Sequence, residues 1–201
     1  MRKVTLLAVV CAFLFLASFA SAQQGDAWFG GGTLMSSGTC NFNSGCPEKG
    51  GFYPTVGADV IFHKRVGFAF ETAWRGSQAL YGGIQGETFR PILTDFNGVY
   101  QPRISKKVGL DLTAGVGWES VRFYSQSTYN TGNCYYFGQC FVSSHHFLMD
   151  VGGGIRYYVW RHLFVRPEVR YYYVNNNTND FTSNNVFRVG ASIGYTIGGP
   201  E

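Results

Sequence analysis

Eight segments between residues 26 and 197 alternate, with a period of two, between apolar positions and small or polar positions. In segment 66–75, one set of alternate positions carries Phe68, Phe70 and Trp74, and the other carries Glu71 and Arg75. Successive side chains of a strand point to opposite faces, so the pattern predicts β-strands. The segments that follow it are 26–35, 52–62, 66–75, 89–101, 108–119, 146–158, 163–174 and 186–197.

The connections between these segments alternate in length. Short links are expected at 63–65, 102–107 and 159–162, and long links near 36–51, 76–88, 120–145 and 175–185. In an antiparallel meander, alternate links lie at the same end. The sequence therefore predicts one end with tight turns and one end with four long loops, in a single domain.

The first 22 residues have the features of a secretory signal peptide. Arg2 and Lys3 precede an apolar run over 4–19, and Ala20-Ser21-Ala22 matches a cleavage site. An uncleaved membrane anchor is the alternative, but the run is short for a spanning helix. We expect residues 1–22 to be removed and residues 23–201 to form one domain.

The composition narrows the class of protein. Only 14% of residues are charged, 17% are aromatic and 27 are Gly. Disordered chains lack aromatic residues, and Gly is costly inside helices, so disorder and helical bundles are both disfavoured. Without Arg2 and Lys3 the formal charge is 14 − 12 = +2. This near-neutral balance argues neither for nor against a nucleic-acid partner, but export argues against one, and none is expected.

Eight alternating strands fit either a soluble barrel with an apolar interior or an outer-membrane barrel with the reverse arrangement. The four Lys after the signal are all in predicted loops or turns, which is unusual for a water-facing sheet. Aromatic residues gather near strand ends, as in membrane girdles. Those four Lys are Lys49, Lys64, Lys106 and Lys107, and the aromatic residues are Trp28, Phe62, Trp74, Tyr100, Trp118, Tyr157, Tyr158, Trp160 and Tyr195.

Charged residues occupy the polar face, which would line the lumen of an outer-membrane barrel. An eight-stranded barrel is barely wide enough for its own side chains, and buried charges need partners. We expect an ion-pair network that fills the lumen; a gated path for small ions is the alternative. The predicted members are Asp59, Glu71, Arg75, Asp95, Asp111, Glu119, Asp150, Arg156, Arg166, Glu168, Arg170 and Arg188.

Four cysteines follow the signal, as two pairs with five residues between partners. Cys40 and Cys46 lie in the first long loop, and Cys134 and Cys140 in the third. Two local disulfides are expected in an oxidising compartment. A cross pairing between the loops, or a metal site with His145 and His146, is the alternative; the spacing disfavours a metal, and none is expected.

The signal peptide, the eight strands, the alternating link lengths and the Gly-rich ending over residues 187–195 resemble the bacterial OmpA/OmpX-type outer-membrane β-barrel superfamily. The resemblance implies an all-β fold: an eight-stranded antiparallel up-and-down transmembrane β-barrel with short periplasmic turns and long external loops. It also implies a monomer in contact with outer-membrane lipid. The sequence departs from the family at its end, where residues 196–201 follow the terminal aromatic residue Tyr195.

Catalysis is not expected. Some barrels of this kind modify lipids with a His and a Ser, but His63 and His162 fall in the turns. Ser143, Ser144, His145 and Glu119 form only a weak constellation, and no cofactor motif is present. Tyr, Phe and Asn in the loops 120–145 and 171–185 indicate either a recognition surface for a ligand or packing of the loops against the barrel rim and lipid headgroups. The sequence thus predicts a structural or adhesin-like protein, with a small channel second and a lipid-modifying enzyme third.

Overall fold

The computed structural model describes residues 24–40, 46–63, 65–81, 87–125, 133–134 and 140–198, so the predicted signal peptide lies outside the described residues. The fold is all-β, as predicted, with two short strands added to eight long ones. The long strands are β1 (Gln24–Ser36), β2 (Tyr53–His63), β3 (Val66–Trp74), β5 (Glu87–Tyr100), β6 (Val108–Ser125), β8 (Cys140–Tyr158), β9 (Leu163–Val174) and β10 (Asn185–Gly198).

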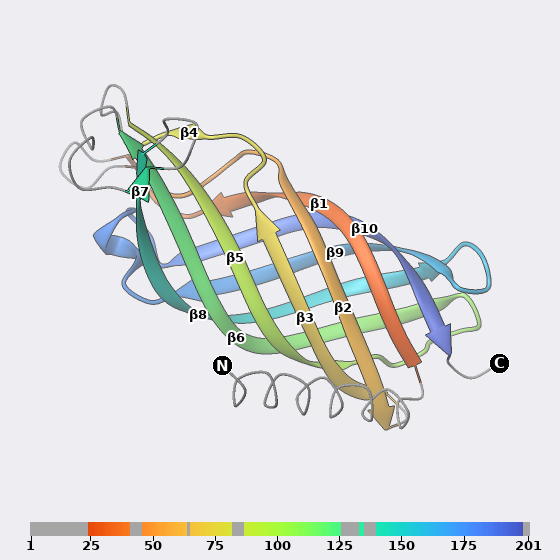
Figure 1. The fold of residues 1–201 in the computed structure, drawn as a ribbon. Coiled ribbons are helices and arrows are strands. Elements are labelled where there is room, and N and C mark those ends of the chain that lie inside the picture. The colour runs from red at the N-terminus through yellow and green to blue at the C-terminus, as the bar shows by residue number, and fades with distance from the viewer. Residues whose placement is uncertain are drawn as a thin grey trace, which may run out of the picture.

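The long strands form a closed antiparallel barrel (Figure 1). Neighbours in the chain are neighbours in the sheet, in the order β3-β2-β1-β10-β9-β8-β6-β5, and β3 pairs with β5 to complete the ring. The first and last strands meet with Gln24 opposite Gly198 and Ser36 opposite Val186. Closure gives each long strand a neighbour on both sides, so the ladder has no free edge.

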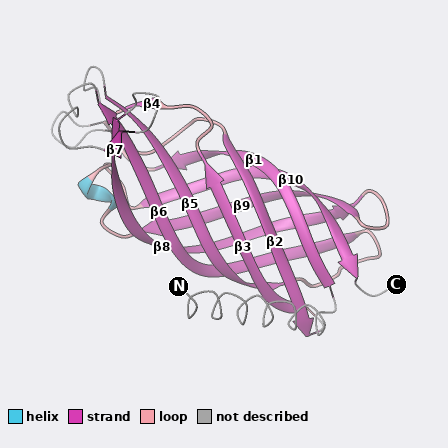
Figure 2. Cartoon of the chain, viewed as in Figure 1, coloured by secondary structure: helices cyan, strands magenta, loops and turns pink. Residues whose placement is uncertain are grey.

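The two ends of the barrel differ, as the link lengths predict. The long connections gather at one end, together with β4 (Ala79–Leu80), β7 (Asn133–Cys134) and a 3-10 turn over Asn177–Asn179 (Figure 2). The short turns, the start of β1 and the end of β10 lie at the other end. We call these the loop end and the turn end. Among the described residues, no helix is long and apolar enough to cross a membrane.

The third connection is shorter than the sequence indicates. Residues 120–145 are expected to form a long loop, but β6 continues to Ser125 and β8 begins at Cys140. Their ladder extends through Ser120 opposite His145 to Tyr124 opposite Phe141. Buried Val121 and His146 continue the alternation in this part of the sheet, and β5 pairs with β6 as far as Glu87 opposite Ser125, so residues 120–125 belong to the sheet and not to a loop.

Apolar side chains cover the outside of the barrel. Phe96, Leu112, Val116, Val151 and Ile155 are about half exposed, although the first four are paired on both sides within the sheet. The inside instead holds the charged residues of the same strands. An apolar exterior around a polar interior is the arrangement of a barrel that faces lipid.

Two of the aromatic residues that we assign to membrane girdles lie inside the barrel. Trp28 and Tyr158 are buried, whereas Tyr157, Trp160 and Tyr195 are exposed. Tyr157 and Tyr158 are neighbours on one strand, so only one of them can face outward. Tyr158 instead packs against Phe164, with ring centroids 5.9 Å apart.

Candidate functional site: the polar lumen and its two ends

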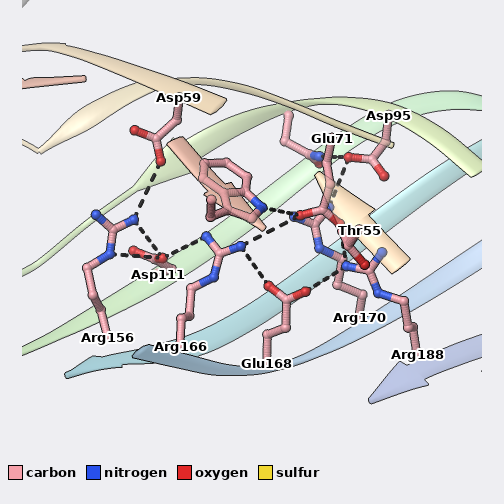
Figure 3. A network of polar contacts seen from close by, with 12 residues as sticks. Thr55, Asp59, Glu71, Asp95, Asp111, Arg156, Arg166, Glu168, Arg170 and Arg188 are labelled. Atoms are coloured by element: carbon pink, nitrogen blue, oxygen red, sulfur yellow. Dashed lines mark hydrogen bonds and ion pairs between the residues drawn. The ribbon is translucent and has the colours of Figure 1, made fainter. Parts of the chain in front are cut away.

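All twelve charged residues that we assign to the lumen are buried there, each less than 10% exposed. Four arginines from β8, β9 and β10 meet carboxylates from β1, β2, β3, β5 and β6, together with Asp150 of β8 and Glu168 of β9 (Figure 3). Because isolated charges are costly away from water, the pairing of these groups decides whether the lumen is stable and closed.

Arg156 organises the network nearest the turn end. Its guanidinium contacts Asp26 on β1, Asp59 on β2 at 3.5 Å and Asp111 on β6 at 2.9 Å. Gln101, at the end of β5, donates a hydrogen bond of 2.8 Å to Asp59. One cation thus joins three carboxylates from three strands at this level of the barrel.

Glu71 organises the middle of the lumen. Its carboxylate is 2.9 Å from the Arg170 guanidinium and 3.6 Å from that of Arg166, and it is also paired with Arg188. The Trp28 indole donates a further hydrogen bond of 3.1 Å. Glu71 therefore accepts hydrogen bonds from Arg170, Arg188 and the Trp28 indole, and the charge of Arg166 lies close by without a hydrogen bond.

Two residues connect these groups into one network. Arg166 lies 3.1 Å from Asp111 and 2.9 Å from Glu168, and Glu168 lies 2.7 Å from Arg188. Arg170 adds Asp95 at 2.9 Å and Asp150 at 3.5 Å. The network thus contains four guanidinium groups and seven carboxyl groups: Asp26, Asp59, Glu71, Asp95, Asp111, Asp150 and Glu168.

A glycine makes room for the indole ring of Trp28 in this network. An added Cβ at Gly57 would lie 2.4 Å from the Trp28 ring, so only glycine fits beside it. The Arg166 guanidinium covers this ring, 4.3 Å from its centroid. Trp28 therefore fills space between the strands, and its indole N–H donates a hydrogen bond to Glu71.

Two of the twelve residues are not part of the ion-pair network. Among the described residues, neither Arg75 nor Glu119 forms an ion pair. Arg75 lies just past the end of β3, where its guanidinium donates to the Gly50 carbonyl at 3.0 Å. Our assignment of both to the network is therefore wrong, because both lie near the loop end, where the first long connection folds over the lumen.

That connection places a second acid beside Glu119. Glu48 is fully buried, accepts a hydrogen bond of 3.2 Å from the Tyr53 hydroxyl, and has the Glu119 carboxyl as a neighbour. Burial raises the pKa of Glu48, although its hydrogen bonds with Glu119 and Tyr53 and the charge of Arg75 oppose the shift. The lumen is thus capped at the loop end by a pair of carboxyl groups.

An aromatic cluster closes the rest of the loop end. Tyr81 and Phe181 come from two different connections and pack with Phe89 and Phe123 of β5 and β6. The centroids are 4.9 Å apart for Tyr81 with Phe123 and 5.0 Å for Phe89 with Phe181. The Tyr81 hydroxyl also donates to the Asp180 carbonyl. These contacts fix the second and fourth connections to each other.

A Ser, a His and an Asp meet near this cluster but are not arranged as a catalytic triad. Ser144 Oγ lies 2.9 Å from His146 Nε2, and Asp180 Oδ2 lies 2.7 Å from the same nitrogen. A triad needs the acid on one ring nitrogen and the nucleophile on the other. Ser143 and His145, which we consider as candidates, lie on the opposite face of β8 from His146, because adjacent strand residues point apart.

The first pair of cysteines is joined by a disulfide between Cys40 and Cys46. Cys134 and Cys140 are backbone partners between β7 and β8, but their side chains lie outside the described part of the structure, so this bridge stays a prediction. Among the described residues, no three His, Cys, Asp or Glu side chains are placed to hold a metal ion.

The sequence pattern missed three buried residues of the lumen: Asp26, Trp28 and Glu48. The glycines at 30–32 hide the alternation of β1, and Glu48 lies in a connection that has no periodicity. Asp26 could have been found from pairing, because it lies opposite Asp59 in the β1–β2 ladder. No comparable signal was available for Glu48.

The model of the outer membrane protein beta-barrel domain matches residues 8–194. No curated protein matches the chain.

Solved structures with the same fold come from several bacteria. Ail, the attachment invasion locus protein of Yersinia pestis, has a TM-score of 0.56 at 13% identity, over 88% of this chain and 99% of that chain. Neisserial surface protein A has a TM-score of 0.56 at 17% identity, over 86% and 95%. A major outer membrane protein from Thermus thermophilus has a TM-score of 0.59 at 12% identity, over 87% and 99%. A second Ail structure, with a TM-score of 0.51 at 14% identity over 87% and 99%, is in complex with the heparin analogue sucrose octasulfate.

Proposed function

Because the chain belongs to the outer membrane protein beta-barrel domain family and is thus a bacterial outer-membrane protein, we propose that it acts as a non-enzymatic surface protein that binds an external partner through its long loops. The barrel serves as a closed anchor. The observation that carries this proposal is the ion-pair network, which joins opposite walls of the lumen. With the interior filled, the loop end is the part of the molecule available to a partner outside the cell.

The composition of the loops supports contact by aromatic and amide groups. Connections 37–52, 75–86, 126–139 and 175–184 together contain two acids, Glu48 and Asp180, and two bases, Lys49 and Arg75. Residues 175–184 include five Asn, and 126–139 include three Tyr and one Phe. Tyr and Asn provide adaptable contact surface with little dependence on charge. A protein or neutral glycan therefore fits these loops better than a polyanion such as the one bound by Ail.

The experiment that tests this proposal is adhesion by a non-adherent bacterium that expresses the chain. Wild type should increase attachment to epithelial cell monolayers, with less than a twofold change between about 50 and 300 mM salt. Replacing Tyr129, Tyr135, Tyr136 and Phe137 together by Ser should remove the increase. Lys49→Gln, which removes an exposed cation at the same end, is the matched control and should leave attachment unchanged.

Two results would overturn the proposal. One is attachment that does not change when the aromatic residues are replaced. The other is steady ion conductance by the purified barrel in planar bilayers, which would favour a channel. A mass change in the lipid A of expressing cells would instead favour a lipid-modifying enzyme, for which the Ser144, His146 and Asp180 geometry gives no support.

A further inference from the structure

Positive charge outside the lumen is concentrated at the turn end. The three turns, 64–65, 101–107 and 159–162, contain six Lys or Arg and no Asp or Glu. The four longer connections at the other end are balanced, with two acids and two bases. The six basic residues of the turns are Lys64, Arg65, Arg103, Lys106, Lys107 and Arg161.

Four of these charges are not neutralised by the described part of the protein. Arg65, Lys106, Lys107 and Arg161 are exposed, and none forms an ion pair with a described carboxylate. The acidic residues of the neighbouring strands, Asp26, Asp59 and Asp111, are buried and form ion pairs with Arg156. The turn end therefore presents an uncompensated positive surface.

The same turns expose large apolar side chains. Trp160 is 76% exposed and Ile104 is 65% exposed, beside Arg161 and Arg103 respectively. Such mixtures occur where a protein meets lipid headgroups, since aromatic rings prefer the membrane interface and long cations extend their charge to the phosphates. Short turns of outer-membrane barrels face the periplasm. The turn end thus lies at the headgroup level of the inner leaflet, which is made of phospholipid.

A niche on the outer wall of the barrel brings basic and aromatic side chains of the turn end together. Trp160, Arg161, His162, Leu163 and Tyr195 line a cavity of about 340 Å³. The rings of His162 and Tyr195 pack with centroids 5.6 Å apart, and the backbone N–H of Thr196 donates a hydrogen bond of 2.8 Å to the His162 carbonyl, which fixes this turn to β10. Two basic side chains and two aromatic walls thus face one lipid-sized space.

A second turn adds charge beside this niche. The backbone N–H of Tyr158 donates a hydrogen bond of 2.8 Å to the carbonyl of Lys107, so the turn over residues 101–107 lies next to the turn over residues 159–162. Lys106 and Lys107 are both exposed. The niche is therefore part of a wider basic surface and is not an isolated pair of charges.

We propose that the turn end binds anionic phospholipid of the inner leaflet, with one headgroup phosphate held in the niche of Arg161, His162, Trp160 and Tyr195. The guanidinium and the imidazole bind the phosphate, and the aromatic rings contact the glycerol and the upper acyl chain. Arg65, Arg103, Lys106 and Lys107 attract further anionic headgroups around the rim. This lipid preference is independent of what the external loops bind.

The test is lipid retention by the folded full-length barrel, measured by native mass spectrometry after exchange from mixed micelles. Wild type should retain phosphatidylglycerol at least fivefold better than phosphatidylcholine. The double variant Arg161→Gln with His162→Gln should lose most of that preference. Lys49→Gln, which removes one cation at the opposite end, is the control and should keep it. A heat-modifiable shift in gel migration establishes that each variant is folded.

Two further measurements distinguish a lipid phosphate from a free phosphate, and a lipid from an acidic polymer. Millimolar glycerol phosphate should not displace the lipid, because it lacks the acyl chain that the rings contact; displacement would assign the niche to free phosphate. Equal retention of the two lipids by wild type, or an unchanged preference in the double variant, would overturn the proposal. So would binding of soluble polyglutamate that is lost in the double variant while lipid retention is kept, since the basic surface would then serve an acidic polymer of the periplasm.

Discussion

Glu71 on β3 and Arg170 on β9 form an ion pair of 2.9 Å across the lumen. In the ring order of the sheet, β3 and β9 are four strands apart in both directions, so the pair spans the diameter of the barrel. The two side chains together reach from one wall to the other. A lumen crossed in this way is filled by protein at its middle.

Replacing Glu71 by Leu should destabilise the barrel by about 3–5 kcal/mol, because Arg166, Arg170 and Arg188 would lose a shared partner while still buried. Urea unfolding in lipid vesicles, followed by the gel-migration shift, measures this loss. Thr72→Val changes the next residue of the same strand, and it should cost far less because no buried charge is left unpaired. Equal effects of the two changes would contradict the role assigned to Glu71.

Leu112 tests which face of the barrel meets lipid. It is exposed on the apolar exterior, in the part of β6 that the sequence assigns to the membrane (108–119), so Leu112→Arg should cost roughly 2–4 kcal/mol in a bilayer. Ile104→Arg, also exposed but in a turn, should cost only about 0–1 kcal/mol. Folding titrations in vesicles compare the two. If Leu112→Arg were harmless, the apolar exterior would not be embedded in the membrane.

Glu48 should make the packing of the first connection depend on pH. Burial raises its pKa, so the folded state holds the proton more tightly than the unfolded chain does. Its stabilising contribution is fully present below the ordinary pKa of a carboxyl group and is lost as the pH rises through the raised pKa. Hydrogen exchange of residues 46–52, corrected for the intrinsic rate, should therefore be slower at pH 5 than at pH 8.

The matched variant for this effect is Glu48→Gln, which keeps a polar group beside Tyr53 and removes the titration. Its protection should be the same at both pH values. Glu119, Arg75 and His146 also act on Glu48, so the midpoint belongs to the group as a whole. A wild-type protein with equal protection at pH 5 and pH 8 would refute the prediction.

Reduction should loosen the loop end without unfolding the barrel. The Cys40–Cys46 bridge closes a short loop and contributes about 2 kcal/mol in the chain-entropy description, and this acts on the local segment. The barrel depends on its closed hydrogen-bonded ladder. Proteolysis with and without reductant should thus differ only in the connections.

Peptide mapping without reductant tests the second predicted bridge at the same time. It should find Cys40 linked to Cys46 and Cys134 linked to Cys140. A peptide linking Cys46 to Cys134 would show that the bridges join two different loops, which would contradict local pairing.

The fold was largely predictable from the sequence because one physical rule governs most of it. A strand between lipid and a narrow polar lumen must alternate, so 108–119 and 163–174 show their inward charges directly. Alternation no longer marks the strands where they leave the membrane, because lipid then no longer requires an apolar outer face. Above the lipid, β6 and β8 continue as a hairpin through residues 120–125 and 140–145, which the sequence alone suggests are loop.

The sequence predicts which residues lie in the lumen better than it predicts which carboxylate pairs with which arginine. Burial of Arg166 and Glu168 follows from alternation, but which carboxylate meets which guanidinium depends on the stagger of the strands. Glu48 was missed because a loop residue enters the barrel only through tertiary packing. Arg75 was misassigned because its strand ends one residue before it, at Trp74.

The seam between β1 and β10 has a consequence for how the protein reaches its final state. Gln24 is paired with Gly198, so the first strand finds one of its two neighbours only after the whole sheet has been made. Until then, the backbone groups along both terminal strands are open to pairing with other chains. A chain that lacks residues 185–198 would therefore keep two unpaired edges, on β1 and β9, that no side chain can satisfy in lipid. Insertion and closure should accordingly occur as one cooperative event, and aggregation should compete with it before the last strand arrives.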